Sequence, residues 1–353
     1  MTHYSELETP CVLIDLDKAE ANLAHAQELA NAAGIALRPH IKTHKLPYFA
    51  KRQVELGAVG ITVQKLGEAE VMADADLTDL LLTYNIIGSA KRARLKALHD
   101  RVTIRVVADS AECVDGLAET FTDAAHKLGV FVECDTGMGR CGVQSAADAL
   151  ALARRISAAP GLAFAGLMTY PAAGKHRESA QWMAEAKALF DAQGVELPAI
   201  TTGGTPDMAH MNEAGVATEY RPGTYIYMDR SQVAAGAATF DDCALTVLAT
   251  VVSRPTDDRA IIDAGSKTLT SDLLGLQGHG YVVEYPDSKI VGLSEEHGTV
   301  DVSACATKPK IGDVIRIIPN HCCPVTNLFD RVNFIRNGDL VETVPVAARG
   351  RVD

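Results

Sequence analysis

The sequence predicts an α/β protein with a (β/α)8 barrel of the TIM type and a second, mainly antiparallel β domain. Eight short apolar runs occur between residues 35 and 220, and helical stretches separate nearly all of them. Polar residues fall at or just after the ends of these runs, and a barrel would bring them to one rim. After about Gly236 the pattern changes to alternating runs typical of an antiparallel sheet. An open doubly wound sheet is the alternative, and it would spread the same polar residues along one edge.

The first element expected is a strand over residues 11–16, after which Asp17 caps an alanine-rich helix that ends near Gly34. The predicted barrel strands are residues 35–41, 59–64, 79–84, 102–107, 130–135, 163–170, 199–202 and 217–220. The predicted helices between them are residues 45–56, 65–75, 90–99, 111–128, 146–158, 177–192 and 207–214. Short apolar runs of this kind are typical of strands that are buried on both faces.

The second half of the chain predicts a sheet of short alternating strands. These are residues 245–252, 259–262, 280–283, 289–293, 298–302, 314–318, 331–336 and 339–344. Asn337 and Gly338 separate the last two, and this dipeptide is a strong signal for a tight hairpin turn.

Composition excludes several classes of protein. The net charge of −12 argues against a nucleic-acid partner, because such proteins cluster lysine and arginine. The polar start of the chain and the lack of a long apolar run predict a cytoplasmic protein with no membrane partner. The eight cysteines are scattered through the chain, which does not indicate a disulfide framework.

Lys42 is the first candidate for chemistry. It follows a predicted strand, and Arg38, His40, His44 and Lys45 are its neighbours in sequence. Nearby cations disfavour the protonated amine, so we interpret Lys42 as a nucleophile that could form a Schiff base. A basic loop at a sheet edge is the alternative.

Two glycine-containing turns, residues 200–206 and 221–224, follow the last two predicted barrel strands. Gly203 and Gly204 let a ligand approach the backbone, and the helix after them offers unpaired amides for an anion. A phosphate site at this place recurs in barrel enzymes, although each turn could equally be a simple tight turn. A lysine, a phosphate site and a barrel together suggest pyridoxal 5′-phosphate (PLP).

Residues 319–324 contain the second candidate site. If the strand before them continues, His321 and Cys323 project to one side and Cys322 to the other. Imidazole and thiolate are good ligands for a borderline-soft divalent ion, and two protein ligands leave positions open for substrate. A buried cysteine pair beside a surface histidine is the alternative.

These segments resemble the D-threonine aldolase and D-serine dehydratase group of the alanine-racemase-like (fold-type III) PLP enzymes. The resemblance covers nearly the whole chain in order. It is carried by residues 9–10, 38–45, 135–143, 203–206, 221–225, 263–267, 294–298 and 319–323. It implies a PLP-binding barrel over residues 17–235, a β domain built from residues 1–16 and 236–353, and a homodimer acting on a small D-amino acid.

The resemblance also implies residue roles. Lys42 would form the Schiff base with PLP, and His176, in the loop after Tyr170, would act as the catalytic base of the aldolases. The other cofactor contacts it implies are Gln64, Arg140, Tyr170, Gly203, Gly204, Thr205, Gly223 and Thr224. His321 and Cys323 would bind manganese, magnesium or zinc.

Two reactions fit this pattern. An aldolase would break the Cα–Cβ bond of a D-β-hydroxy-α-amino acid, giving glycine and an aldehyde, and residues 169–171 with His176 favour it. A dehydratase of D-serine or 3-hydroxy-D-aspartate would remove hydroxide instead, and Cys323 favours that reaction. We predict the aldolase, because His176 has a defined role in it. Two further alternatives are a PLP-supply protein, which would lack the β domain, and a cofactor-free Schiff-base aldolase.

Overall fold

The computed structural model describes residues 2–353, which form two compact units. Unit 1 contains the chain up to Ala24, Thr43–Leu46 and Thr224–Gly350, and unit 2 contains His25–Lys42, Pro47–Gly223 and Arg351–Asp353. The predicted domain boundary between residues 235 and 236 stays a prediction.

Unit 2 is built around a parallel sheet of eight strands. They are β2 (Ala36–Leu37), β3 (Ile61–Val63), β4 (Asp79–Asn85), β5 (Thr103–Ala108), β6 (Leu128–Cys134), β7 (Leu162–Thr169), β8 (Ile200–Thr202) and β9 (Glu219–Tyr220). Their order is β2-β9-β8-β7-β6-β5-β4-β3. Backbone bonds from Val59 N to Leu37 O (2.9 Å) and from Thr62 N to Pro39 O (2.7 Å) join the two ends of this order. The predicted barrel architecture is confirmed, and the alternative open sheet is wrong.

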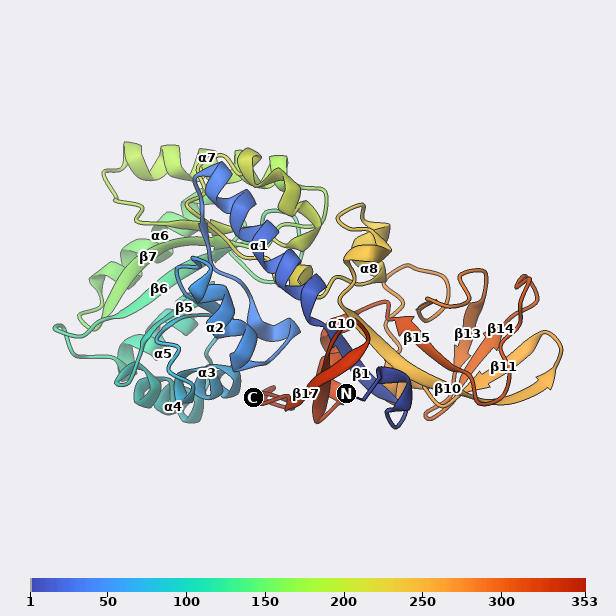
Figure 1. Cartoon of the computed structure of the whole chain (residues 1–353). Helices are drawn as coiled ribbons and strands as arrows, with labels where there is room; N and C mark the ends of the chain where they lie inside the picture. Colours follow the sequence, from blue (N-terminus) through green and yellow to red (C-terminus); the bar gives the residue numbers. More distant parts are fainter. Residues whose placement is uncertain (1) are drawn as a thin grey trace. The chain divides into compact units, whose positions relative to one another are not determined.

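Helices cover the outside of this sheet, as Figure 1 shows for α4 to α7. The helices are α1 (Leu16–Ala33), α2 (Pro47–Glu55), α3 (Leu66–Asp74), α4 (Ser89–His99), α5 (Ala111–Thr120), α6 (Ala146–Ala158) and α7 (His176–Ala192). Ser110 and Ser145 cap α5 and α6 by accepting backbone N–H groups three residues later. Inside the sheet, buried Leu81, Val107 and Met168 pack together.

Two predicted helices of unit 2 differ from the structure. The helix expected over residues 111–128 ends at Thr120, and β6 already begins at Leu128. The Asp123 carboxylate accepts the N–H of Ala125 at 2.8 Å, and this local bond favours a turn over a continued helix. The helix expected over residues 207–214 is a 3-10 segment, η3 (Thr205–Glu213), with non-helical dihedrals at Asp207 and His210.

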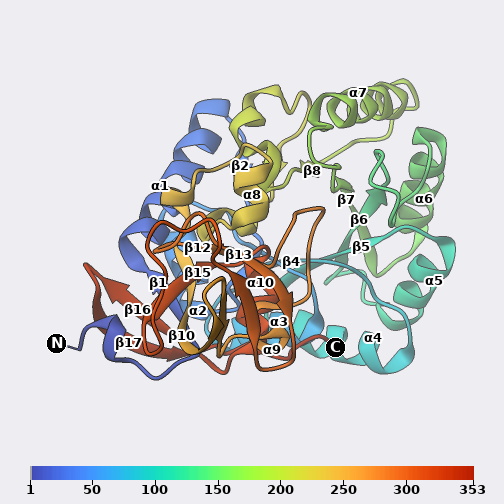
Figure 2. The same cartoon turned by 90° about the vertical axis from the view of Figure 1, so that its right-hand side faces the viewer.

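Unit 1 contains a sheet of nine strands, several of which lie side by side in Figures 1 and 2. They are β1 (Cys11–Asp15), β10 (Leu245–Thr256), β11 (Arg259–Ile262), β12 (Tyr281–Val282), β13 (Lys289–Leu293), β14 (Gly298–Asp301), β15 (Val314–Ile318), β16 (Arg331–Arg336) and β17 (Asp339–Pro345). All pairs are antiparallel except β1 with β16. The predicted turn between β16 and β17 has positive φ at both Asn337 (51°) and Gly338 (84°), as a primed hairpin turn requires.

Unit 1 also contains short helical segments. They are η1 (Tyr4–Glu6), η4 (Thr224–Ile226), α8 (Arg230–Ala234), η5 (Phe240–Asp242), α9 (Ser266–Leu269) and α10 (Cys322–Leu328). Across residues 2–353, no helix combines the length and apolarity needed to cross a membrane.

Candidate active site

Lys42 lies in a short 3-10 turn, η2 (Ile41–Thr43), that follows β2. Its backbone N–H donates to His40 Nδ1 at 3.3 Å. The other imidazole nitrogen of His40 lies 3.0 Å from Gln64 Oε1, and the Gln64 amide donates to the Thr83 carbonyl at 2.9 Å. These hydrogen bonds fix the turn that carries Lys42. They also engage both the oxygen and the nitrogen of the Gln64 side-chain amide.

The predicted crowding of Lys42 by Arg38 is wrong. The Arg38 guanidinium is 7% exposed and pairs with Glu219 at 2.6 Å and Asp79 at 2.5 Å. Asp79 and Glu219 are the first residues of β4 and β9, whereas Lys42 comes after the end of its strand. In a parallel barrel these positions lie at opposite ends, so the Arg38 charge is neutralised away from the lysine.

The side chains of Lys42 and Arg140 both lie near the ring of Tyr170. Lys42 Nζ lies 5.9 Å from the centre of the Tyr170 ring, and Arg140 Cζ lies 5.3 Å from it. Both cations are within range of the electron-rich ring face. Three of the residues predicted for the cofactor site are therefore brought together within unit 2.

A cavity of about 560 Å³ adjoins this group, and Gln64, Asn85, Glu133 and Arg140 are among its lining residues. Glu133 is only 5% exposed; burial raises the pKa of its carboxyl to about 6, while the charge of Arg140 opposes the rise. Within residues 2–353, Asn85 Oδ1 is a buried acceptor with no hydrogen-bond partner. A buried acceptor of this kind favours a polar ligand in the cavity.

The turn after β8 holds the predicted phosphate residues. Gly203 has φ +95°, and a side chain there would overlap the ring of Tyr220. The Tyr220 hydroxyl donates to the Gly204 carbonyl at 3.0 Å, and a Cβ on Gly204 would lie 3.1 Å from the Tyr170 ring. Thr205 is 3% exposed and begins η3. The close approach of two aromatic rings thus explains both glycines.

The second predicted phosphate turn falls at a boundary between the units. Gly223 ends its stretch of unit 2, and Thr224 begins the next stretch of unit 1. Arg221, just before this turn, donates to Thr201 Oγ1 at 2.7 Å and to the Thr169 carbonyl. Burial lowers the pKa of its guanidinium to about 10.

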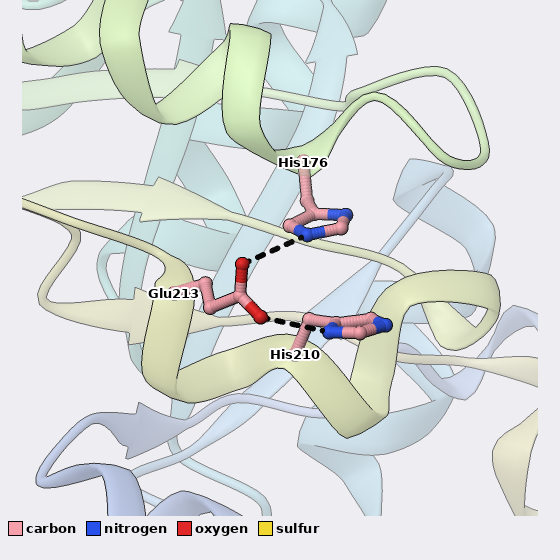
Figure 3. A group of neighbouring side chains, drawn as sticks. All are labelled: His176, His210 and Glu213. Atoms are coloured by element: carbon pink, nitrogen blue, oxygen red, sulfur yellow. Dashed lines mark hydrogen bonds and ion pairs between the residues drawn. The ribbon is translucent and has the colours of Figure 1, made fainter.

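His176 is the first residue of α7 and does not lie in the loop where the sequence predicted it. Its Nδ1 lies 3.2 Å from Asp207 Oδ1, and its Nε2 lies 3.4 Å from Glu213 Oε2. The ring stacks on His210 with a centroid distance of 4.4 Å and an interplanar angle of 8° (Figure 3). Both imidazole nitrogens therefore face carboxylates, and Nε2 must leave Glu213 before it can accept a proton from a substrate.

The cluster of His176, His210 and Glu213 has ligand atoms within 4.8 Å of one another, which is close enough to consider a metal. The imidazole lone pairs lie in the ring planes, and two stacked parallel rings aim them side by side at separate points. In addition, Arg177 pairs with Glu213 at 2.6 Å. We therefore interpret the cluster as two histidines bridged by a carboxylate (Figure 3). His210 was assigned no catalytic role from the sequence, and its contact with Glu213 was not predicted, although their spacing of three within one helical turn was a signal.

The predicted metal ligands lie in unit 1, where β15 ends at Ile318 and α10 begins at Cys322. His321 is the N-cap of α10 and the last extended residue, with φ −141° and ψ 106°. The expectation of a strand through residue 323 is therefore wrong. His321 and Cys323 still interact by a side-chain hydrogen bond, because the helical turn brings them together, while Cys322 is fully buried.

Hydroxyls and carboxylates surround this pair within unit 1. Cys323 Sγ lies 3.2 Å from Thr43 Oγ1 and 3.7 Å from Thr224 Oγ1. His321 Nδ1 lies 2.8 Å from Asp272 Oδ2. Burial lowers the pKa of His321, but the hydrogen bonds with Cys323 and Asp272 outweigh it and raise the pKa to about 9. The imidazole is thus set in a negative environment that suits a cation.

The comparisons with known proteins agree with this geometry. Residues 14–231 match the model of the alanine racemase N-terminal domain, and residues 244–335 match that of a putative serine dehydratase domain. A D-threonine aldolase of Arthrobacter sp is 35% identical over 98% of this chain and 94% of its own length. A 3-hydroxy-D-aspartate aldolase of Paracoccus denitrificans is 32% identical over 98% of this chain and 93% of its own.

A solved structure shows the same relationship. The crystal structure of D-threonine aldolase from Filomicrobium marinum superposes with a TM-score of 0.92 at 32% identity, covering 99% of this chain and 98% of that one. This chain belongs to the D-threonine aldolase and D-serine dehydratase group of alanine-racemase-like enzymes. Both units are covered by these matches, so membership extends to the β domain as well as the barrel.

The residues present fit the two groups that this family implies. For PLP, the fit rests on Lys42 beside Tyr170 and Arg140 and on the adjoining cavity with its unpaired Asn85 acceptor. For a divalent metal, it rests on the donor set of His321 and Cys323 and on the carboxylate behind the imidazole.

Proposed function

We propose that this protein is a carbon–carbon lyase that cleaves D-β-hydroxy-α-amino acids of the D-threonine type to glycine and an aldehyde. The observation that carries the proposal is the convergence of Lys42 and Arg140 on Tyr170, in a chain similar over its full length to two aldolases. PLP, when bound, supplies an electron sink for the charge that develops at Cα.

Each predicted site residue of unit 2 has a proposed role. Lys42 would be the amine that holds PLP. Arg140 places a positive charge beside the cofactor and opposes the charge of Glu133. Tyr170 packs beside both cations. The turn at Gly203 and the amides that begin η3 favour a phosphate, together with the predicted contacts Gln64, Gly204, Thr205, Gly223 and Thr224.

Proton transfer at the substrate hydroxyl is assigned to His176. Asp207 and Glu213 orient its ring. His176 Nε2 accepts the proton after it breaks its contact with Glu213 and contacts the substrate hydroxyl instead. His321 and Cys323 would hold the divalent ion, whose Lewis acidity lowers the pKa of a bound hydroxyl. An imidazole and a thiolate suit zinc better than magnesium, while manganese stays within the proposal.

The assembly and location of the protein stay predictions. We expect a homodimer in the cytoplasm that acts on a small D-amino acid, with no nucleic acid or membrane partner.

A dehydratase is the second candidate function. The observation that favours it is that residues 244–335, which contain His321 and Cys323, match a putative serine dehydratase domain. In that reaction Lys42 would remove the Cα proton of D-serine or 3-hydroxy-D-aspartate, and hydroxide would leave.

Product analysis separates the two functions. Protein supplied with PLP, zinc or manganese, and D-threonine is expected to give glycine and acetaldehyde by mass spectrometry, whereas 2-oxobutanoate and ammonia would establish the dehydratase. Lys42→Ala is expected to lose the visible cofactor band and all turnover. No product from D-threonine, D-serine or 3-hydroxy-D-aspartate would refute both functions. Turnover by colourless protein without PLP would establish a cofactor-free aldolase.

A further inference from the structure

Asp272 is a carboxylate of unit 1 that neither reaction uses. Its Oδ2 lies 2.8 Å from His321 Nδ1, and it comes from the loop between α9 and β12, far in sequence from the histidine. The His321 side chain is 30% exposed and the Asp272 side chain 46% exposed. A pair this exposed contributes little to stability, which leaves an effect on the chemistry of the histidine.

The loop that carries Asp272 is tied to the segment that carries His321. Asn320, which is 1% exposed, donates from Nδ2 to the Asp272 carbonyl (3.1 Å) and the Gly278 carbonyl (2.8 Å). Arg230 adds bonds to Asn320 Oδ1 (3.0 Å) and to the Gln277 carbonyl (2.8 Å). Asn320, the neighbour of His321, thus bonds to the loop at both Asp272 and Gly278. These bonds fix the Asp272 carboxylate relative to the His321 imidazole.

Asp272 lies behind the histidine and is not a third ligand. Across residues 2–353, the only group of three His, Cys, Asp or Glu residues whose ligand atoms all lie within 4.8 Å is His176, His210 and Glu213. Asp272, His321 and Cys323 are therefore too far apart to share one ion. Since Asp272 occupies Nδ1, Nε2 is the nitrogen of His321 that remains for a metal.

We propose that Asp272 is a positioning residue for the metal site: its carboxylate accepts the Nδ1–H of His321 and so fixes the ring with the Nε2 lone pair available to the ion. The inference rests on the proposed function, in which His321 and Cys323 hold a divalent metal. A carboxylate behind a ligating imidazole sets its tautomer and orientation and makes it a stronger donor.

Metal affinity tests this role without relying on turnover. The dissociation constant for Zn²⁺ is measured by competition with a chromogenic chelator for the wild type and for the Asp272→Ala, Asp272→Asn and His321→Ala variants. Asp272→Ala is expected to weaken Zn²⁺ binding by about 10- to 100-fold, the usual effect of losing such a partner. Asp272→Asn keeps an acceptor without the charge and is expected to lose less, while His321→Ala loses the site.

Asp258 provides the matched control. It is an exposed carboxylate of the same unit, and it pairs with Lys308 at 2.6 Å. Asp258→Ala removes the same charge and is expected to leave Zn²⁺ affinity unchanged, as well as the PLP absorbance band. Circular dichroism checks the fold, and the isosteric Asp272→Asn variant serves if Asp272→Ala does not fold.

The outcomes separate the inference from the function it rests on. Equal Zn²⁺ affinity in wild type, Asp272→Ala and Asp272→Asn would overturn the role of Asp272 and leave the metal-dependent reaction intact. A wild type that binds neither Zn²⁺ nor Mn²⁺ would overturn both. Weakened binding in the Asp272 variants, in protein that turns over none of the D-amino acids, would support the positioning role and refute the proposed reaction.

Discussion

Glu133 shows how the environment of one residue sets the properties of the cavity. It lies on β6, its neighbours Arg140 and Arg221 carry positive charge, and it is nevertheless a weaker acid than usual. Desolvation therefore outweighs the attraction of the two cations. The carboxyl gains a proton in the folded protein at a pH where it would be ionised in the unfolded chain.

This shift has a consequence for stability. The pKa of Glu133 rises from 4.5 to about 6 on folding, so between these values the native state binds more protons than the unfolded state. The free energy of unfolding therefore falls as the pH rises through this window, because the buried carboxyl loses its proton. The total loss is about 2 kcal/mol. Glu133→Gln is expected to raise the free energy of unfolding of the apoprotein by up to this amount at about pH 8, and by little at about pH 4.

Urea unfolding at the two pH values measures the effect. Glu119→Gln is the control, because its side chain is 72% exposed and pairs only at the surface with Arg92. It is expected to change stability by less than about 0.5 kcal/mol at either pH. An equal effect of Glu133→Gln at both pH values would refute the assignment of the pH dependence to this carboxyl.

At the scale of elements, the turn between β8 and η3 links the fold to the proposed phosphate site. Gly203 needs its positive φ, and it also lies so close to the Tyr220 ring that no Cβ fits. Gly194 has φ +64°, and nothing lies within 4 Å of a Cβ placed there. A side chain at Gly194 would therefore cause backbone strain alone, whereas a side chain at Gly203 would also collide with the Tyr220 ring.

Gly203→Ala and Gly194→Ala are expected to differ in their effect on the cofactor. Both should cost about 1–2 kcal/mol from the left-handed backbone, and Gly203→Ala should also displace Tyr220 from its bond to the Gly204 carbonyl. We expect Gly203→Ala to weaken PLP binding at least about tenfold, equivalent to about 1.4 kcal/mol, and Gly194→Ala to leave it unchanged. Titration of each apoprotein with PLP, followed by absorbance, makes the comparison; equal affinities would remove Gly203 from the cofactor site.

The elements also show what the sequence could predict. Alternation of apolar residues predicted β11, β13, β15 and β16 with their observed bounds, because each strand is bounded by turn residues that also appear in the sequence. The end of α5 and the 3-10 form of η3 were missed. These depend on local side-chain bonds and dihedrals that compete with a helical pattern.

The site was predicted unevenly for a similar reason. Lys42, Tyr170 and Arg140 were expected together from the resemblance, and the structure brings them together. The pairing of Arg38 with Asp79 and Glu219 was not expected, since neighbours in sequence point to opposite ends of the barrel. Asp272 could not be found from spacing, because 49 positions separate it from His321 and only the folded sheet joins them.

At the scale of the whole molecule, the loop between α9 and β12 is a candidate contact surface for a second subunit. Thr270 and Leu274 have positive φ values of 66° and 49°, which cost energy for residues with a Cβ. Leu273 and Leu274 are 44% and 53% exposed. Strained backbone that presents two leucines to solvent is consistent with a surface that a second copy of the chain covers.

We therefore expect this loop to lie in a dimer interface. Size-exclusion chromatography with light scattering is expected to give the wild type twice the 37.5 kDa mass of one chain. The double variant Leu273→Asp with Leu274→Asp should elute as a monomer, because buried unpaired carboxylates cost several kcal/mol at an interface. Ile311→Asp, at a side chain 65% exposed elsewhere in unit 1, should remain dimeric. A monomeric wild type would refute the homodimer, and a dimeric double variant would place its interface on other residues.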